Sequence, residues 1–348
     1  MSIELLSERD RQILTSLITE YILTAEPVGS RRIAKKYINL SSATIRNIMS
    51  DLEEMGLLHQ PHTSAGRVPT EKALRFYVDS ILKVKNLNPT ARKRIRGKYH
   101  FSEMEATDVI KQTSEVLSVL SHHISVVSAP KIIGTILRHI EFIKITKDRI
   151  LVIFVSQSGF VQNRIIEDHD GISQDELDKY SHYLNEILVG LSLEEVRLKI
   201  ENEMKQEKII YDQLLSKALT LGKEALGQQV ETELYIEGRA NLLECPEFSE
   251  IEKMKSLFHA LEEKNKIVSL LDKSRDAQGV QIFIGSETDF LDMQECSIIT
   301  SPYHHGSDVI GVLGIIGPTR MNYLKLIPIV EYSAQLVTEF LNTRFQQM

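Results

Sequence analysis

The stretch that most constrains this chain covers residues 39–70, NLSSATIRNIMSDLEEMGLLHQPHTSAGRVPT. Ser41 or Ser42 can cap a helix that runs to about Met55, and Gly56 stands where a glycine commonly ends a helix. The polar loop PHTSA then lies between GLLHQ and GRVPT, which favours a short hairpin. The stretch therefore predicts a helix followed by a hairpin.

The segments around this stretch extend the pattern. Apolar residues recur at helical spacing over 13–22, after a capping pair made by Ser7 and Asp10. Ser30 can cap a short second helix, RRIAKKY, and a further helix starts at Thr70. The order helix, helix, helix, hairpin predicts a winged helix-turn-helix domain over residues 1–87.

The third helix separates into two faces when its residues are placed about 100° apart. One face is an apolar stripe, expected to be buried: Ile45, Ile48, Met49 and Leu52. The opposite face carries Ala43, Asn47, Ser50 and Glu54. The N-terminal end of the helix carries small, hydroxyl, amide and basic groups: Ser42, Ala43, Thr44, Arg46 and Asn47. This set suits a helix that enters the major groove.

These residue types have specific partners on DNA. Asn can pair with adenine, Arg with guanine or phosphate, and Ala with a thymine methyl group. In the loop, Gly66 permits a tight turn and Arg67 can reach phosphate or the minor groove from the wing tip. The candidate DNA-binding residues are Ser41, Ser42, Ala43, Thr44, Arg46, Asn47, His62, Ser64, Gly66 and Arg67.

Taken alone, an amphipathic helix with a serine cap and an arginine is an ordinary surface helix. Charge distribution favours the DNA interpretation. Residues 1–100 contain 17 Lys and Arg against 10 Asp and Glu, a net charge of +7, whereas the remainder carries −14. A basic first third on an acidic body indicates that only the first part meets a polyanion.

Beyond this domain the pattern predicts a mixed α+β body. A basic linker is expected at 88–100, then a long helix that includes His122 and His123 and continues to about Ala129. A three-strand antiparallel meander follows within 139–167. The later predicted elements are helices from Ser173, among them EKIIYDQLLSKALTLGKEAL, the strand ELYIEGR, two helical stretches from Pro246, the strands VQIFIGSE, CSIITSPY and VIGVLGIIGP, and a terminal helix from about Asn322. One face of the first stretch after Pro246 is marked by Phe248, Ile251, Met254, Phe258 and Leu261.

Several classes of protein do not fit this sequence. No GxSxG, HExxH, P-loop or GxGxxG motif stands in a fitting context, so we expect no enzyme and no cofactor. Cys245 and Cys296 lie far apart without a zinc-ligand spacing, so we expect reduced cysteines and no metal. The chain shows neither a signal peptide nor an apolar run long enough to span a bilayer, which favours a cytoplasmic protein.

Four blocks near the N-terminus, SSATIRN, DLEEMGLL, PHTSAGRVPT and YVD, resemble the bacterial heat-inducible transcription repressor HrcA family. GVLGIIGPTRMNY, near the other end, is similar to that family's C-terminal signature. The chain departs from the family at Ile48, usually acidic, and at Ala73-Leu74, usually Gly-Tyr. Because Ile48 lies on the apolar stripe, we expect it to change packing rather than base choice.

The resemblance implies a multidomain α+β protein: the winged helix, a GAF-like domain at 101–168 and 232–348, and a largely helical dimerisation domain inserted at 169–231. The border of the insertion stays open, since part of 136–168 can belong to it. The resemblance also implies a homodimer that represses chaperone operons at an inverted-repeat (CIRCE) operator. Its activity would depend on the GroEL chaperonin, on temperature, or on both.

One alternative is a ligand-responsive regulator whose GAF-like domain binds a small molecule. Tyr303, His304, His305 and Asp308 are its candidate residues, although a loop that connects two strands is the favoured interpretation. Arg320, after Gly317-Pro318, is expected to anchor the terminal helix or an interface rather than to bind phosphate.

Overall fold

The computed structural model describes residues 6–81, 87–99, 106–129, 136–157, 161–192, 195–196, 198–200, 217–222, 233–275, 277, 279–306 and 308–345. They form two compact units. The first is drawn from residues 1–127, 234–303 and 312–337, and the second from residues 128–233, 304–311 and 338–348. Most of the predicted helix EKIIYDQLLSKALTLGKEAL lies outside the described residues.

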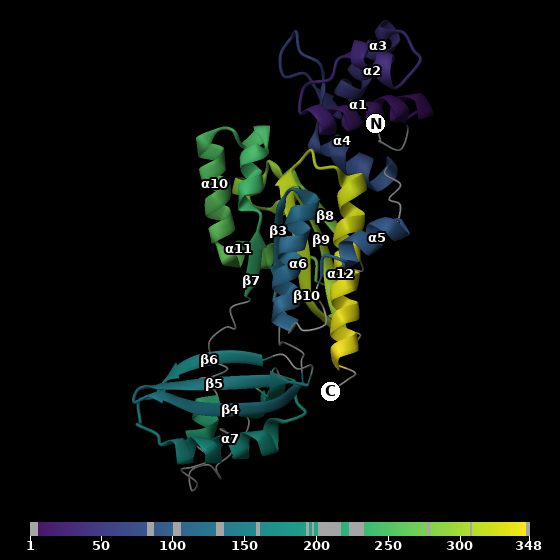
Figure 1. Ribbon diagram of the computed structural model, residues 1–348. Coiled ribbons are helices and arrows are strands. Elements are labelled where there is room, and N and C mark those ends of the chain that lie inside the picture. Colours follow the sequence, from purple (N-terminus) through teal and green to yellow (C-terminus); the bar gives the residue numbers. More distant parts are fainter. Residues whose placement is uncertain are drawn as a thin grey trace. The chain divides into compact units, whose positions relative to one another are not determined.

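The N-terminal part of the first unit is the predicted winged helix-turn-helix (Figure 1). Its elements are α1 (Glu8–Thr24), α2 (Ser30–Lys36), α3 (Ser42–Glu54), β1 (Leu58–His59), β2 (Val68–Pro69) and α4 (Glu71–Phe76), which continues as a π-helical turn (Tyr77–Ile81). Ser7 and Asp10 form the predicted capping box, and Ser41 caps α3 by accepting a hydrogen bond from the Thr44 amide. Gly56 adopts a left-handed conformation, with φ of 71°.

The sequence predicted that Ser30 caps α2, and this prediction was wrong. Gly29 occupies the cap position, and Ser30 is the first residue of the helix. Its hydroxyl oxygen lies 2.9 Å from that of Ser42, so the two serines join the starts of α2 and α3. A serine next to a glycine offers two possible cap positions, and spacing alone does not distinguish them.

A buried carboxylate holds α2 against α1. Glu20 is 3% exposed, and it accepts hydrogen bonds from Lys36 Nζ and Tyr37 Oη, each at 2.6 Å. Arg32 lies 3.7 Å from the same carboxylate. The hydrogen bond from Lys36 is the main reason that the pKa of Glu20 lies below its usual value. This ionic cluster therefore stabilises the charged form and fixes α2.

The segment predicted as a basic linker is largely helical. Asn88 caps α5 (Pro89–Arg96), in which Ile95 is buried, and Tyr99 is buried just after it. The guanidinium of Arg92 lies 5.3 Å from the ring centre of Tyr332. The charge of this segment masked its helical signal, because Ile95 is the one buried side chain within α5.

A mixed α/β domain completes the first unit. Its five-stranded sheet has the order β7-β3-β10-β9-β8, and helices lie on both faces (Figure 1). The strands are β3 (Ile124–Ser128), β7 (Leu234–Glu237), β8 (Gln281–Ile284), β9 (Cys296–His305) and β10 (Asp308–Pro318). The helices are α6 (Ala106–Ser121), α10 (Ile251–Glu262), α11 (Lys264–Asp272) and α12 (Tyr323–Phe345). Helices α10 and α11 share a core with alternate residues of β3, β9 and β10.

One boundary of this domain was predicted wrongly. The expected long helix through His122 and His123 ends at Ser121, and β3 follows. His122 has φ of 58°, which ends the helix, and the β-branched run from Ile124 favours a strand. His123 is half-buried, and burial, assisted by the charge of Arg320, lowers its pKa to about 4.

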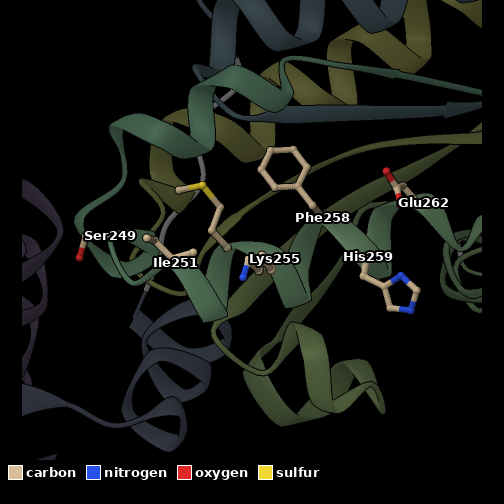
Figure 2. Close-up of a pocket in the computed structure, with 7 residues that line it drawn as sticks. Ser249, Ile251, Lys255, Phe258, His259 and Glu262 are labelled. Carbon is tan, nitrogen blue, oxygen red and sulfur yellow. The ribbon is translucent and has the colours of Figure 1, made fainter.

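The predicted apolar face of α10 is shifted. Its buried residues are Leu257, Ala260 and Leu261, whereas Ile251 is 70% exposed at the start of the helix. Figure 2 shows Phe258 and His259 projecting from opposite sides of the helix. Of the five residues that the sequence placed on one face, Phe248 and Leu261 are buried and Met254 and Phe258 are half-buried. The buried face of the helix is therefore centred about a quarter turn from the predicted one.

The second unit contains a three-stranded sheet in the order β4-β5-β6, built from β4 (Leu137–Thr146), β5 (Arg149–Ser156) and β6 (Val161–Glu167). This is the predicted meander. One face packs against α7 (Gln174–Leu188) in a core that includes Phe142, Phe154 and Tyr180. The sheet therefore groups with α7 in the second unit, in the part of the chain between β3 and β7, and this agrees with the alternative border that left part of 136–168 to the insertion. Alternating apolar residues predict a buried face but do not say which core covers it.

Candidate nucleic-acid interface

Helix α3 has the two faces that its sequence predicts. Ile45, Met49 and Leu52 are buried, and Ile48 is 9% exposed, which confirms that this departure from the family pattern is a packing residue. On the other side Ala43, Arg46 and Asn47 are exposed. The N-terminal half of α3 thus presents a small, a basic and an amide side chain to solvent.

The hydroxyl groups at the start of α3 have roles inside the domain. Ser41 Oγ accepts from the Thr44 amide at 3.0 Å and lies 2.8 Å from Thr44 Oγ1. Ser42 contacts Ser30. Among the candidates on the helix, Ala43, Arg46 and Asn47 are therefore the ones best placed to contact bases or phosphates.

The wing is attached to the helices through its backbone. The Val28 amide donates to the Arg67 carbonyl oxygen, and the Arg67 amide donates to the Val28 carbonyl oxygen, both at 2.9 Å. At Gly66 a Cβ atom would lie only 2.4 Å from the Val28 carbonyl carbon. Gly66 is thus required because two backbones approach closely here. The tight turn that the sequence predicted would need a left-handed φ at Gly66, and its φ is not left-handed.

Arg67 lies at the base of the wing rather than at its tip. Its Nε atom is 2.8 Å from Glu53 Oε2 near the end of α3, and its side chain is 18% exposed. This ion pair joins the wing to α3. His62 and Ser64, in contrast, are exposed in the loop between β1 and β2. These two residues form the accessible part of the wing among the predicted contacts.

A groove runs between α3, the start of α2 and the wing. It is lined by Val28, Gly29, Ser30, Arg31, Arg46, Met49, Gln60, Thr63, Ser64, Ala65, Gly66 and Arg67. Arg31 and Arg46 are exposed there, and neither has a carboxylate partner among the described residues. The groove brings Arg46 together with Ser64, Gly66 and Arg67 of the wing, whereas Ala43, Asn47 and His62 are not among its lining residues. The two cations in it suit a phosphate of the DNA backbone.

Arg31 and Gln60 were missed by the sequence interpretation. Gln60 Nε2 donates to the carbonyl oxygens of Thr63 and Ala65, at 3.0 and 2.8 Å, and so shapes the wing loop. Arg31 and Arg32 are adjacent and chemically identical in the sequence. Only the structure shows that Arg32 faces Glu20 and Glu26 whereas Arg31 faces the groove.

The residues considered for a small-molecule site belong to a strand and its turn. Tyr303, His304 and His305 end β9, with Tyr303 fully buried, and Gly306 turns the chain towards β10. On α10 a shallow groove is lined by residues of the one segment Ser249–Glu262 (Figure 2). At the β9 turn, the amides of His304 and Gly306 donate to Thr338 Oγ1 and Asn342 Oδ1 of α12, at 3.0 and 2.9 Å, so the polar groups there are paired within the fold. The groove on α10 draws its lining from one segment, unlike ligand pockets, in which polar groups converge from several elements. No cluster of metal-ligating side chains occurs within the described part of the chain.

The close approach at Gly66 predicts that Gly66→Ala disrupts the wing. The added methyl group would force Val28 and the wing apart, so we expect a lower unfolding temperature and weaker operator binding. Gly29→Ala is the matched control, because nothing lies within 4 Å of a Cβ atom there. Thermal unfolding and DNA binding of both variants check this, and equal effects would contradict it.

The different surroundings of two neighbouring arginines generate a second prediction. Arg31→Ala removes an exposed cation that is placed to meet a phosphate, so we expect affinity to fall for all DNA sequences and the slope of log Kd against log salt to fall by about 1. Arg32→Ala leaves that slope unchanged, because Arg32 lies 3.4 Å from Glu26 and 3.7 Å from Glu20. Titrations at several salt concentrations measure both, and an unchanged slope for Arg31→Ala would refute the assignment.

Comparison with known proteins agrees with this geometry. A family model described as "Winged helix-turn-helix transcription repressor, HrcA DNA-binding" matches residues 5–82, and one described as "HrcA protein C terminal domain" matches residues 107–327. A solved structure described as a hypothetical protein at 2.2 Å resolution shares the fold, with a TM-score of 0.64 at 23% identity over 97% of this chain and 99% of that one.

Two curated relatives share one name, and each matches this chain over almost its whole length. The "Heat-inducible transcription repressor HrcA" of Geobacter sulfurreducens is 51% identical over 337 residues, covering 97% of this chain and 98% of the relative. That of Syntrophobacter fumaroxidans is 46% identical over 339 residues, with 97% of each chain covered. Because the matches span both the DNA-binding domain and the body, the chain belongs to the HrcA family of heat-inducible transcription repressors.

Proposed function

We propose that this protein represses chaperone operons by binding an inverted-repeat operator of the CIRCE type as a homodimer in the cytoplasm. The observation that carries the proposal is the exposed N-terminal half of α3, which presents Ala43, Arg46 and Asn47. Of these, Arg46 lines the groove together with Arg31. In this proposal α3 enters the major groove and the wing loop contacts the adjacent backbone.

Direct base recognition is assigned to the end of α3 that carries no acidic residue. Asn47 can bond an adenine edge and Arg46 a guanine edge or a phosphate, while Ala43 permits close approach. Acidic residues begin at Asp51, further along the helix. Of the remaining predicted contacts, His62 and Ser64 stay as wing contacts, and the free nitrogens of Arg67 can meet a phosphate only beside its ion pair with Glu53.

The outer face of the β4-β5-β6 sheet supports a homodimer. Ile143, Leu151 and Ile165 lie in one cross-strand row of this sheet, and Val155 pairs with Val161 in another. Ile145, Val161 and Ile165 are 49%, 54% and 54% exposed. The same face also carries polar residues, among them Glu141 and Asn163 in the row of Ile153. A second copy of this face would cover its apolar rows symmetrically.

The proposal for regulation by heat is based on the family to which the chain belongs. The proposal is that chaperonin assists the repressor into its active form, so that unfolded clients relieve repression by occupying the chaperonin. Direct thermal inactivation of the repressor is the alternative route. Operator binding measured across temperature, with and without purified chaperonin, separates them: only the first route predicts that added chaperonin restores binding.

The dimer proposal predicts different affinities for whole and half operators. The unaltered chain should bind the inverted repeat at least about tenfold more tightly than a single half-site, since the second contact becomes intramolecular. Ile165→Glu places a charge on the exposed sheet face, and we expect it to give a monomer by sedimentation and to remove that preference.

Leu291→Glu is the control for this experiment. Leu291 is 82% exposed and lies outside the inserted sheet, so the same kind of change there should leave both the molecular mass and the preference intact. Equal affinity of the unaltered chain for the whole operator and the half-site would contradict the dimer.

A further inference from the structure

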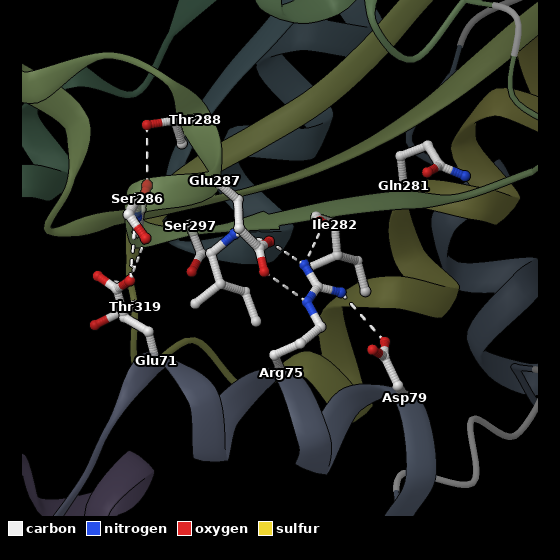
Figure 3. Close-up of polar contacts among 12 residues, drawn as sticks. Glu71, Arg75, Asp79, Gln281, Ile282, Ser286, Glu287, Thr288, Ser297 and Thr319 are labelled. Carbon is white, nitrogen blue, oxygen red and sulfur yellow. Dashed lines mark hydrogen bonds and ion pairs between the residues drawn. The ribbon is translucent and has the colours of Figure 1, made fainter. Parts of the chain in front are cut away.

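Helix α4 of the winged-helix domain is fixed to the α/β domain by polar contacts (Figure 3). Arg75 Nε donates to Glu287 Oε1 at 2.9 Å, and Nη2 of the same guanidinium pairs with the other carboxylate oxygen. Nη2 also donates to the Ile282 carbonyl oxygen at 2.6 Å. Arg75 thus bonds both the β8 strand and the turn after it, which gives a directional contact.

A second contact lies one helical turn earlier on α4. Glu71 Oε2 accepts from the Ser286 amide at 3.2 Å and from Ser286 Oγ at 2.7 Å. The turn is shaped to receive it. Gly285 has φ of 56°, and a Cβ atom there would lie 2.0 Å from the Glu71 carboxylate. Two contacts a turn apart restrain α4 against both sliding and rotation.

The Glu287 carboxylate, which pairs with Arg75, is itself held in place. Glu287 Oε2 accepts from the Ile284 amide at 2.9 Å, and Arg75 Nη1 lies 3.2 Å from Asp79 on its own helix. Both partners therefore keep one orientation. The side chains of Arg75 and Glu287 are still 29% and 38% exposed, so the pair contributes little to stability compared with its effect on geometry.

The orientation of α4 determines that of the DNA-contacting elements. Thr70 caps α4, and its hydroxyl donates to the carbonyl oxygens of Gly56 and Leu57 at 2.8 and 3.2 Å, just after α3. Lys72 Nζ donates to the Met55 carbonyl oxygen at 3.1 Å. A rotation of α4 would therefore turn α3 and the wing with it.

Another polar contact joins the two domains at α1. Arg320 Nη1 donates to the Ile22 carbonyl oxygen at 3.2 Å, near the end of α1, and Arg320 also pairs with Glu247. This agrees with the sequence expectation that Arg320 anchors an interface. The winged helix is thus attached at α1 and at α4.

We propose that Arg75 and Glu71, through Glu287 and Ser286, are positioning residues that set the direction of α3 for simultaneous binding of two half-sites. They do not touch DNA in this proposal. A dimer meets both half-sites only when its two recognition helices have the separation and direction that the operator requires. This inference rests on the proposed homodimer.

The test compares three duplexes with the full chain: a single half-site, the inverted-repeat operator, and the same operator with two base pairs added between its halves. We expect Arg75→Ala and Glu287→Ala to bind the half-site within about twofold of the unaltered chain. On the operator each should lose about tenfold in affinity, because loose attachment lowers the effective concentration of the second domain. The preference for the original spacing should also shrink.

Lys35→Ala is the matched control, since Lys35 is an exposed cation on α2 of the same winged-helix domain and takes no part in the contacts of α4 described above. It should change half-site and operator binding by the same factor. The double variant Arg75→Ala/Glu287→Ala should lose less than the product of the two single losses, because both changes remove the Arg75–Glu287 pair.

Two results would overturn the positioning role. One is an Arg75→Ala variant that keeps the affinity and spacing preference of the unaltered chain. The other is a loss on the half-site as large as the loss on the operator, which would mean that Arg75 supports the fold of the winged helix. If the unaltered chain itself binds half-site and operator equally, the homodimer proposal fails and the positioning role falls with it.

Discussion

The bridge between Val28 and Arg67 is the constraint on which the rest of the DNA-binding surface depends. Two backbone hydrogen bonds join the turn between α1 and α2 to the base of the wing, and Gly66 supplies the room that they need. The Glu53–Arg67 ion pair joins the same base of the wing to α3. Because of this bridge, the start of α2, the exposed edge of α3 and the wing loop surround one groove.

Polar contacts also join the winged helix to the α/β domain. Arg75, Glu71 and Arg320 join the two through charge-assisted hydrogen bonds at defined angles. Half-exposed ion pairs stabilise little, but they restrict orientation. A repressor that must match two half-sites benefits from such restriction more than from added stability, so the character of the contacts agrees with the proposed mode of binding.

Local periodicity predicted the parts of the fold that depend on one helix. The stripe of Ile45, Met49 and Leu52 is buried because a 3.6-residue repeat places those side chains on one side, and Ser41 caps α3 because a serine there can meet the Thr44 amide. The order of elements in the winged helix followed from the same signals. Departures at Ile48 and at Ala73-Leu74 are explained by packing, since all three residues are buried.

What the sequence could not show depends on long-range partners. Arg67 next to a glycine looks like a wing-tip residue until Glu53 is seen beside it. Arg31 and Arg32 look alike in the sequence, but Arg32 lies on the side of α2 that faces Glu20 and Arg31 does not. The meander joined the insertion because α7, not α6, covers its apolar face, and β3 replaced the end of a predicted helix because it pairs with β10. In each case the deciding contact comes from a distant part of the chain.

The central claim is that the exposed edge of α3 recognises bases. The direct measurement is the affinity of the unaltered chain and of Asn47→Ala for the operator and for each of its single-base variants. The account predicts that Asn47→Ala loses about 1–3 kcal/mol on the operator and no longer discriminates at one base-pair position of each half-site, while its discrimination elsewhere persists. An Asn47→Ala profile identical to that of the unaltered chain at every position would contradict it.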